Sequence, residues 1–286
     1  MHGSVSIVVL NWNGFSDTAA CLSSLEHLDY PNYRVMVVDN GSTDDSAARI
    51  RKDFPSVELI ETGKNLGFAG GCNVGIRQAI REGAEFIWLL NNDTTVDPGA
   101  LKALVDGAQT EPRIGAVGSA IYYMHDRERL QCWGGGYVNF WLGRSRHIFK
   151  QKDEGKLQFV TGASLLLTRA AIDEVGELDE GFFMYWEDAD YCFRIRAAGA
   201  KLAVAGSSKI WHKESSSVGK GSSRMDSYFS ASAARFFRKH AAFPSLPLWT
   251  GVTLSFAKRA FTGDWERLGT LWMAVADSKG VRRIAK

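Results

Sequence analysis

The chain has 286 residues, of which 45% are hydrophobic and 23% are charged, so it can bury a substantial core and is not an intrinsically disordered protein. Its formal net charge of +2 argues against a protein that binds nucleic acid through a strong positive field. The four cysteines are far apart and form no Cys-x-x-Cys pair, which favours reduced structural thiols over a disulfide framework or a zinc site.

The N-terminal part of the chain alternates between short apolar runs and amphipathic segments. The pattern predicts strands at 5–10, 33–38, 57–60 and 86–90, and helices at 19–25, 46–51, 72–81 and 98–108. Strands and helices that alternate with short connections are typical of a parallel sheet wound with right-handed crossovers. We therefore predict an α/β fold with a mainly parallel, Rossmann-like sheet flanked by helices, and a nucleotide-binding half at residues 1–112.

The pattern changes at about residue 114. Strands are predicted at 114–123, 159–168 and 201–210, separated by longer Gly-rich or charged loops and by one helix at 189–198. A mixed half of this kind supplies acceptor-side walls and lids to a nucleotide-binding half. We therefore predict one domain at residues 1–225, with the acceptor-side half at 113–225.

After Met225 the chain becomes helical and aromatic, which predicts a helical C-terminal extension at 226–286. Basic residues gather near its end: Lys258, Arg259, Arg267, Lys279, Arg282, Arg283 and Lys286. Segments of this sort lie on anionic membrane surfaces, but packing onto the domain and a dimer contact are equally open. No run approaches the roughly 20 apolar residues of a membrane-spanning helix, and the N-terminus lacks the basic start of a signal peptide. We expect a soluble or at most peripheral protein.

Polar residues follow three of the predicted strands. Asn11 ends the first strand, Asp39 ends the second, and Asn91, Asn92 and Asp93 end the fourth. In open parallel sheets ligands bind outside the carboxyl ends of the strands, where an acidic residue after the second strand can bind ribose or base. Asp93 is a hard oxygen ligand suited to holding Mg²⁺ or Mn²⁺ against a diphosphate. Ordinary Asx-turns account for the same residues, and single motifs do not decide between the two interpretations.

A Gly-rich segment, Asn65 to Gly75, lies between a predicted strand and a predicted helix. Backbone amides at a helix start can hold phosphate, and glycines let a ligand approach the backbone. The segment is neither the dinucleotide fingerprint nor a Walker A loop. A loop whose glycines pack against a helix explains it equally well.

The densest cluster of aromatic and acidic residues runs from Leu178 to Arg194. Aromatics there directly precede Glu187, Asp188 and Asp190. Aromatic faces beside acids suit a wall that binds sugar, and a carboxylate in such a wall can be a general base. An acidic first helical turn would explain the carboxylates alone, but not the aromatics before them.

His212 closes the last predicted strand of the domain. A lone histidine is more often a satisfied or exposed residue than a ligand. The Ser/Gly-rich segment after it carries Lys213, Lys220 and Arg224 and either closes over phosphates or is a solvated loop.

Taken as an ordered set, these motifs resemble inverting glycosyltransferases of family 2, and most closely their bacterial rhamnosyltransferase-like branch. The set is Asn11-Trp-Asn-Gly14, Val37-Val-Asp39-Asn-Gly-Ser42, Asn65 to Gly75, Leu89-Leu-Asn-Asn-Asp93-Thr94, Val160-Thr-Gly-Ala163 and Leu178 to Asp190. The resemblance covers about residues 4 to 215. It implies a GT-A fold, a nucleotide-sugar donor and a divalent metal, Mg²⁺ or Mn²⁺.

The resemblance also assigns roles to residues. It makes Asp188 the catalytic base and gives the metal to Asp93, with His212 as a second ligand. Asn91 stands in the first place of the family's Asp-x-Asp motif, so Asp93, the diphosphate and His212 would hold the metal. The donor nucleotide is expected at Asn11, Asp39, Asn65, Gly70, Asn73 and Asn92, and the acceptor side at Gly162, Trp186 and Glu187.

The expected activity is transfer of a hexose or deoxyhexose, such as rhamnose, from a UDP- or dTDP-sugar to a glycan or lipid-linked glycan during synthesis of a bacterial surface polysaccharide. The expected location is the cytoplasm, either free or peripheral on the inner face of the cell membrane. A nucleotidyltransferase is a rival, although no Arg or Lys follows the first strand. A non-catalytic nucleotide- or glycan-binding protein on the same fold is another, and the oligomeric state stays open.

Overall fold

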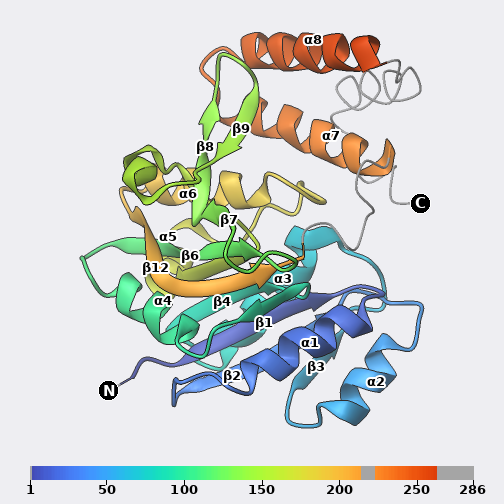
Figure 1. Ribbon diagram of the computed structural model, residues 1–286, viewed down its shortest axis with the longest axis vertical. Helices are drawn as coiled ribbons and strands as arrows, with labels where there is room; N and C mark the ends of the chain where they lie inside the picture. The colour runs from blue at the N-terminus through green and yellow to red at the C-terminus, as the bar shows by residue number, and fades with distance from the viewer. Residues whose placement is uncertain (1, 214–222, 263–286) are drawn as a thin grey trace.

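In the computed structural model, which describes residues 2–213 and 223–262, a nine-stranded sheet forms the centre of the molecule (Figure 1). The strands lie in the order β3-β2-β1-β4-β11-β6-β12-β5, and β7 pairs with β6. Their bounds are β1 (Val5–Asn11), β2 (Tyr33–Asp39), β3 (Glu58–Glu61), β4 (Phe86–Asn91), β5 (Thr94–Val96), β6 (Ile114–Tyr123), β7 (Leu130–Trp133), β11 (Ser164–Thr168) and β12 (Lys201–His212).

The two halves of the sheet differ in strand direction. Strands β3, β2, β1 and β4 are all parallel, as the alternation of strands and helices predicts. Strand β11 is antiparallel to both β4 and β6, while β12 runs parallel to β6 and antiparallel to β5. The predicted α/β fold with a parallel first half and a mixed second half is confirmed.

Helices cover both faces of the sheet. Apolar residues of α1 and α4 pack into the core on one face, and those of α3, α5, α6 and α7 into the core on the other. The helices are α1 (Phe15–Leu25), α2 (Ser46–Asp53), α3 (Gly67–Arg81), α4 (Ala100–Ala108), α5 (Arg169–Val175), α6 (Glu187–Ala197), α7 (Ser223–His240) and α8 (Ser245–Thr262), with a 3₁₀ helix at Gln151–Lys156. The four cysteines are buried and free, as predicted.

A small second sheet contains β8 (Gly135–Asn139), β9 (Arg144–His147) and β10 (Phe159–Val160). The sequence did not predict the β8–β9 hairpin, because its glycines and charges look like a loop. The single strand predicted at 159–168 is wrong. Val160 pairs with Gly135 in the small sheet, whereas Ser164 pairs with Leu90 in the large one, so the chain changes sheets between them. A continuous apolar run carries no mark of such a change.

Helix α3 begins at Gly67, earlier than the predicted start at residue 72, so most of the Gly-rich segment is helix and not a loop. Its glycines let the helix lie close to β1. A Cβ atom at Gly71 would stand 2.4 Å from Leu10 Cδ1, and one at Gly75 would stand 2.3 Å from Val8 Cγ1. Gly71 and Gly75 therefore serve to pack the helix against the sheet, which is one of the two interpretations of this segment.

Of the C-terminal extension, α7 packs within the chain, because Phe236 and Phe237 are almost wholly buried in the core beside α6. Of the basic residues in the sequence argument, six lie outside the described residues: Lys220, Arg267, Lys279, Arg282, Arg283 and Lys286. Arg224, Lys258 and Arg259 lie in α7 and α8, where the structure describes their backbone alone. No helix in the described parts of the chain is both long enough and apolar enough to cross a membrane. The domain boundary at residue 225 stays a prediction.

We predict that Gly75→Val lowers the free energy of unfolding by about 1–3 kcal/mol, because a side chain there collides with Val8 in the core. Valine gains only a few tenths of a kcal/mol over glycine in helix propensity, which is too little to compensate. Urea unfolding measures the change. The matched control is Gly155→Val, since nothing lies within 4 Å of a Cβ atom at Gly155. Equal losses in both variants would contradict the close packing of α3 on β1.

Candidate active site

The carboxyl ends of β1, β2 and β4 are joined by a chain of hydrogen bonds that runs in one direction. Asn92 Nδ2 donates to Thr18 Oγ1 at 3.0 Å, and Thr18 Oγ1 donates to Asn11 Oδ1 at 2.7 Å. Asn11 Nδ2 then donates to Asp39 Oδ1 at 2.8 Å. All four side chains are buried. These hydrogen bonds hold the Asp39 side chain in place, so the role of Asn11 is to position Asp39.

A second set of amides fixes the start of α3. Asn40 Oδ1 accepts from the Leu66 backbone N–H at 3.0 Å, and Asn65 Oδ1 accepts from the Gly67 N–H at 2.8 Å. Gly67 has a φ of +77°, and its backbone abuts Phe183 so closely that a Cβ atom would stand 2.4 Å from the Phe183 carbonyl oxygen. Only glycine fits both the left-handed backbone and this contact.

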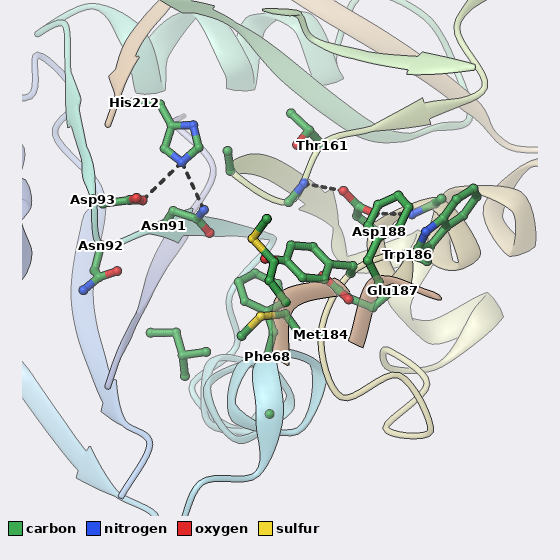
Figure 2. A pocket seen from close by; sticks show the side chains of 18 of the residues that line it. Phe68, Asn91, Asn92, Asp93, Thr161, Met184, Trp186, Glu187, Asp188 and His212 are labelled. Atoms are coloured by element: carbon green, nitrogen blue, oxygen red, sulfur yellow. Dashed lines mark hydrogen bonds and ion pairs between the residues drawn. The ribbon is translucent and has the colours of Figure 1, made fainter. Parts of the chain in front are cut away.

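A cavity of about 510 Å³ opens at these strand ends. It is lined on one side by the ends of β4 and β12 and on the other by residues 184–189, with α3 and β9 between them. Figure 2 shows His212 pointing towards Asp93 and Asn91 on one side, and Asp188 and Glu187 on the other side, with Phe68 and Met184 between the two.

Asp93 and His212 meet because β12 runs antiparallel to β5 with His212 opposite Thr94. His212 Nε2 lies 3.2 Å from Asp93 Oδ1, and both side chains are largely buried. Two ligands at right angles on a cation with bonds of about 2.1 Å are about 3 Å apart, so the spacing fits two neighbouring positions of one divalent ion. A carboxylate with one imidazole, completed by phosphate oxygens, is a donor set that Mn²⁺ or Mg²⁺ accepts.

Gln131, on β7, orients the imidazole from the other side. Its Oε1 lies 2.9 Å from His212 Nδ1, so Nδ1 carries a hydrogen and Nε2 is the ring nitrogen that faces Asp93. Within the described residues no three or more His, Cys, Asp or Glu side chains gather as a metal site, so substrate oxygens would have to supply the remaining ligands.

Asp188, across the cavity, is held by two backbone donors. The Gly162 N–H donates to Oδ2 at 2.8 Å, and the Ala189 N–H donates to Oδ1 at 2.7 Å. The Gly162 donor comes from the segment where the chain changes sheets. Burial raises the pKa of Asp188, and the two N–H donors offset the rise only in part. A half-buried carboxylate with a raised pKa in a cavity wall is suited to accept a proton.

The two acids beside Asp188 have different surroundings. Glu187 is 6% exposed, lines the cavity and has no partner for Oε2 among the described residues. Burial, followed by the neighbouring Asp188, raises the pKa of Glu187 well above its ordinary value, so it keeps its proton. Asp190 is fully buried and anchors α6 to α7 through His240 Nε2 and Lys239 Nζ, both at 2.7 Å. Burial would raise the pKa of Asp190, but the hydrogen bonds from His240 and Lys239 outweigh it and lower the pKa.

The turn that leads into α6 is strained. Tyr185 and Trp186 both have a φ near +70°, a region that bulky side chains rarely adopt. Helix α7 holds the turn in place: Ser232 Oγ donates to the Met184 carbonyl at 2.7 Å, and the Trp186 ring packs against Phe236 and Phe237 with centroids 4.8 and 5.3 Å away. The strain is maintained by tertiary packing, and it sets the direction in which Asp188 leaves the turn.

The structure brings most of the predicted site residues to one cavity. Those lining it are Asn65, Asn92, Asp93, Gly162, Trp186, Glu187, Asp188 and His212. Asn11 and Asp39 lie just behind the lining. Asn73 lies away from it, because its amide group exchanges two hydrogen bonds with the Leu178 backbone, and Gly70 packs near Leu66.

Sequence reasoning missed several residues of the site, of which three bear most on its geometry. Phe68 and His147 line the cavity, and Gln131 orients His212. Neither Gln131 nor His147 stands in a motif, and both come from strands that looked like loop, so no sequence signal pointed to them. Lys213, in the predicted phosphate-closing segment, donates to Asp17 Oδ1 at 2.8 Å.

Residues 6–176 of the chain match the family described as Glycosyl transferase family 2. An N-acetylglucosaminyl-diphospho-decaprenol L-rhamnosyltransferase of Mycobacterium tuberculosis is 30% identical over 241 residues, which cover 76% of this chain and 78% of the relative. Agl10, a low-salt glycan biosynthesis hexosyltransferase of Haloferax volcanii, is 26% identical over 204 residues, covering 68% of this chain and 62% of the relative.

Two solved structures are similar in fold. The mannosyltransferase PcManGT from Pyrobaculum calidifontis, in complex with GDP-Man and Mn²⁺, matches with a TM-score of 0.60 and 16% identity over 98% of this chain and 76% of its own. GalNAc-T7 with UDP, GalNAc and Mn²⁺ matches with a TM-score of 0.67 and 16% identity over 83% of this chain and 48% of its own.

We predict that Glu187→Gln is more stable than the parent chain and that its advantage grows with pH. The unfolded chain ionises Glu187 near its ordinary pKa of 4.5, whereas burial makes the folded chain hold the proton to higher pH. Above pH 4.5 the folded state therefore binds more protons than the unfolded state, and wild-type stability falls as pH rises. Glutamine cannot ionise and escapes this loss.

Urea midpoints at pH 4.5 and pH 8 measure the difference. The control is Glu128→Gln, which changes an exposed carboxylate. An advantage that is constant across this pH range would show that Glu187 ionises normally in the folded chain.

Proposed function

The chain belongs to glycosyl transferase family 2 and has the GT-A fold, and on that premise we propose an inverting transfer of a hexose or deoxyhexose, with rhamnose as the first choice, from a UDP- or dTDP-sugar. The acceptor is a hydroxyl of a glycan or of a lipid-linked glycan in cell-surface polysaccharide synthesis. The chain would act in the cytoplasm or on the inner face of the cell membrane. The mycobacterial relative, whose name gives a diphospho-decaprenol-linked acceptor and rhamnosyl transfer, supports this choice.

The observation that carries the proposal is the arrangement of two functional groups on opposite sides of one cavity. Asp93 and His212 stand on the diphosphate side, and Asp188 stands across from them (Figure 2). Inversion at an anomeric carbon requires attack from the face opposite the leaving group, so a base and a cation site on opposite walls suit a single displacement. A non-catalytic binding protein needs no such opposition.

Asp93 Oδ1 and His212 Nε2 would hold a divalent cation together with oxygens of the donor diphosphate. Once bound, such a cation neutralises the charge that the departing diphosphate acquires. The donor is placed with its base near Asp39 and its ribose and diphosphate along Asn65, Asn92 and the start of α3. The Asn92-to-Asp39 hydrogen-bond chain then keeps the nucleotide end and the diphosphate end of the crevice in a fixed relation.

Asp188 serves as the general base. The acceptor oxygen forms a bond to the anomeric carbon while its proton passes to Asp188, and the bond from that carbon to the diphosphate oxygen breaks, releasing the nucleoside diphosphate. The two N–H donors on Asp188 keep the carboxylate aimed into the cavity. Trp186, whose ring packs on Phe236 and Phe237, supports the acceptor-side wall of the cavity, and protonated Glu187 offers the acceptor a hydrogen-bond donor.

The test of the function is a screen of UDP-, dTDP- and GDP-sugars for Mn²⁺-dependent hydrolysis and transfer. With the active donor, we predict that Asp188→Asn lowers turnover by ~10²-fold or more, the usual scale for losing a general base, and leaves donor affinity unchanged. Asp173→Asn, at an exposed carboxylate on α5, is the matched control. If Asp188→Asn keeps near wild-type turnover while Glu187→Gln is inactive, the base is Glu187 and the assignment fails.

We further predict that Asp93→Ala weakens Mn²⁺-assisted binding of UDP or dTDP by at least about tenfold, and that His212→Ala weakens it less. Calorimetric titrations with Mn²⁺ and with a chelator separate the metal-dependent part of the affinity. Asp126→Ala removes an exposed carboxylate and should bind as the wild type does. Metal-assisted affinity that survives in Asp93→Ala would place the cation on other residues.

A further inference from the structure

Large apolar side chains are exposed at one end of the molecule. In the described parts of the chain, six of the eight exposed large hydrophobic side chains lie on the tip of the β8–β9 hairpin, on α8 or just before it. We call these six the hairpin–α8 surface: Trp141, Leu142, Phe243, Leu246, Trp249 and Leu254. Trp141 is 73% exposed and Trp249 is 62% exposed. Exposed apolar residues that gather in this way mark an interaction site.

The hairpin tip and α8 are locked together although they are far apart in sequence (Figure 1). Thr250 Oγ1 donates to the Trp141 carbonyl at 2.7 Å. Gly143 has a φ of +61°, and a Cβ atom there would stand 2.0 Å from the Pro247 carbonyl oxygen. Tertiary contacts between the hairpin tip and α8 therefore hold the hairpin–α8 surface together.

Helix α8 turns one side outward and the other towards the domain. Leu246, Trp249 and Leu254 fall within an arc of about 140° at 100° per residue. Leu248, on another side of the helix, packs against the core that contains α6 and α7. The apolar side chains on the outward side of α8 are therefore not covered by other described residues.

The two chain segments that form this surface contain no acid. Residues 134–150 contain Arg144, Arg146 and Lys150 but no Asp or Glu, and residues 241–262 likewise contain no Asp or Glu. All three hairpin cations are exposed. Two such segments stand out in a chain with 32 acidic and 34 basic residues. Tryptophan with surrounding cations and no carboxylate suits the headgroup region of an anionic bilayer.

Strand β9 connects the hairpin–α8 surface to the active-site cavity. Side chains alternate along a strand, so Arg144 and Arg146 face away from Ser145 and His147. Ser145 and His147 line the cavity. From Trp141 to His147 an extended chain spans about 20 Å, so a substrate that leaves the surface along β9 reaches the cavity within that distance.

We propose that the hairpin–α8 surface docks the enzyme on the anionic surface of a lipid bilayer, with Trp141 and Trp249 in the headgroup region and β9 leading from the bilayer to the cavity. This proposal rests on the proposed function only for the lipid-linked acceptor, which would enter along β9. A second copy of the same surface is a poorer occupant, because it would bring unpaired cations against like cations.

The test is flotation of the full-length chain with vesicles of phosphatidylcholine that contain about one-third phosphatidylglycerol, and with vesicles of phosphatidylcholine alone. The wild type should float with the anionic vesicles and far less with the neutral ones. Trp141→Ser combined with Trp249→Ser should lower the bound fraction at least about tenfold. Phe149→Ser is the matched control, because it removes an exposed aromatic outside the surface. Arg144→Gln combined with Arg146→Gln should reduce the preference for anionic vesicles.

Any one of three results would overturn the proposal. The first is a wild type that does not float with anionic vesicles, and the second is a double tryptophan variant that floats as well as the wild type. The third is sedimentation that shows a wild-type dimer which the variant loses, while neither protein binds vesicles. Donor hydrolysis without vesicles is measured on the same samples. It tests the transferase activity separately, so a failure of docking and a failure of the proposed function are distinguishable.

Discussion

Two consecutive aromatic residues held with left-handed backbones set the geometry of the cavity wall that carries Asp188. Backbones of this kind cost about 1–3 kcal/mol each when the residue is not glycine, and they persist only where packing imposes them. Here the imposing element is α7, whose Phe236 and Phe237 enclose the Trp186 ring. Since α6 starts directly after Trp186, the direction of Asp188 depends on that contact. A helix outside the matched family segment therefore decides where Asp188 stands.

The other side of the cavity depends on strand register. His212 reaches Asp93 only because β12 pairs with β5 so that His212 lies opposite Thr94. A slip of one residue would turn the imidazole to the other face of the sheet. The two sides are thus positioned by different forces, one by aromatic packing and one by backbone hydrogen bonds. Gly162 joins them, because it follows β10, precedes β11 on the sheet and donates its N–H to Asp188.

The sequence predicted the parallel half of the sheet, and it pointed to most of the strand-end residues that gather at the cavity, because hydrophobic periodicity and polar strand ends are local signals. It failed where the outcome depends on distant partners. Asn73 stands in a motif yet holds Leu178, and the glycines before it pack on β1, which local sequence cannot distinguish from a ligand-binding loop. The β8–β9 hairpin lacks apolar alternation because glycines and cations occupy it. His147 enters the site from that hairpin, and Gln131 enters from β7, which was not predicted either.

The anchor between α6 and α7 has a consequence for biosynthesis. Asp190 is fully buried, and of its three partners only Arg194 lies on the same helix, whereas Lys239 and His240 are translated some fifty residues later. While the ribosome is still making α7, Asp190 has Arg194 alone as a partner, and the turn at Trp186 lacks its aromatic cover. The sheet can assemble before that moment. The wall that carries Asp188 forms last, so an incomplete chain in the cell has the Asp93 and His212 side of the cavity before Asp188 is in place.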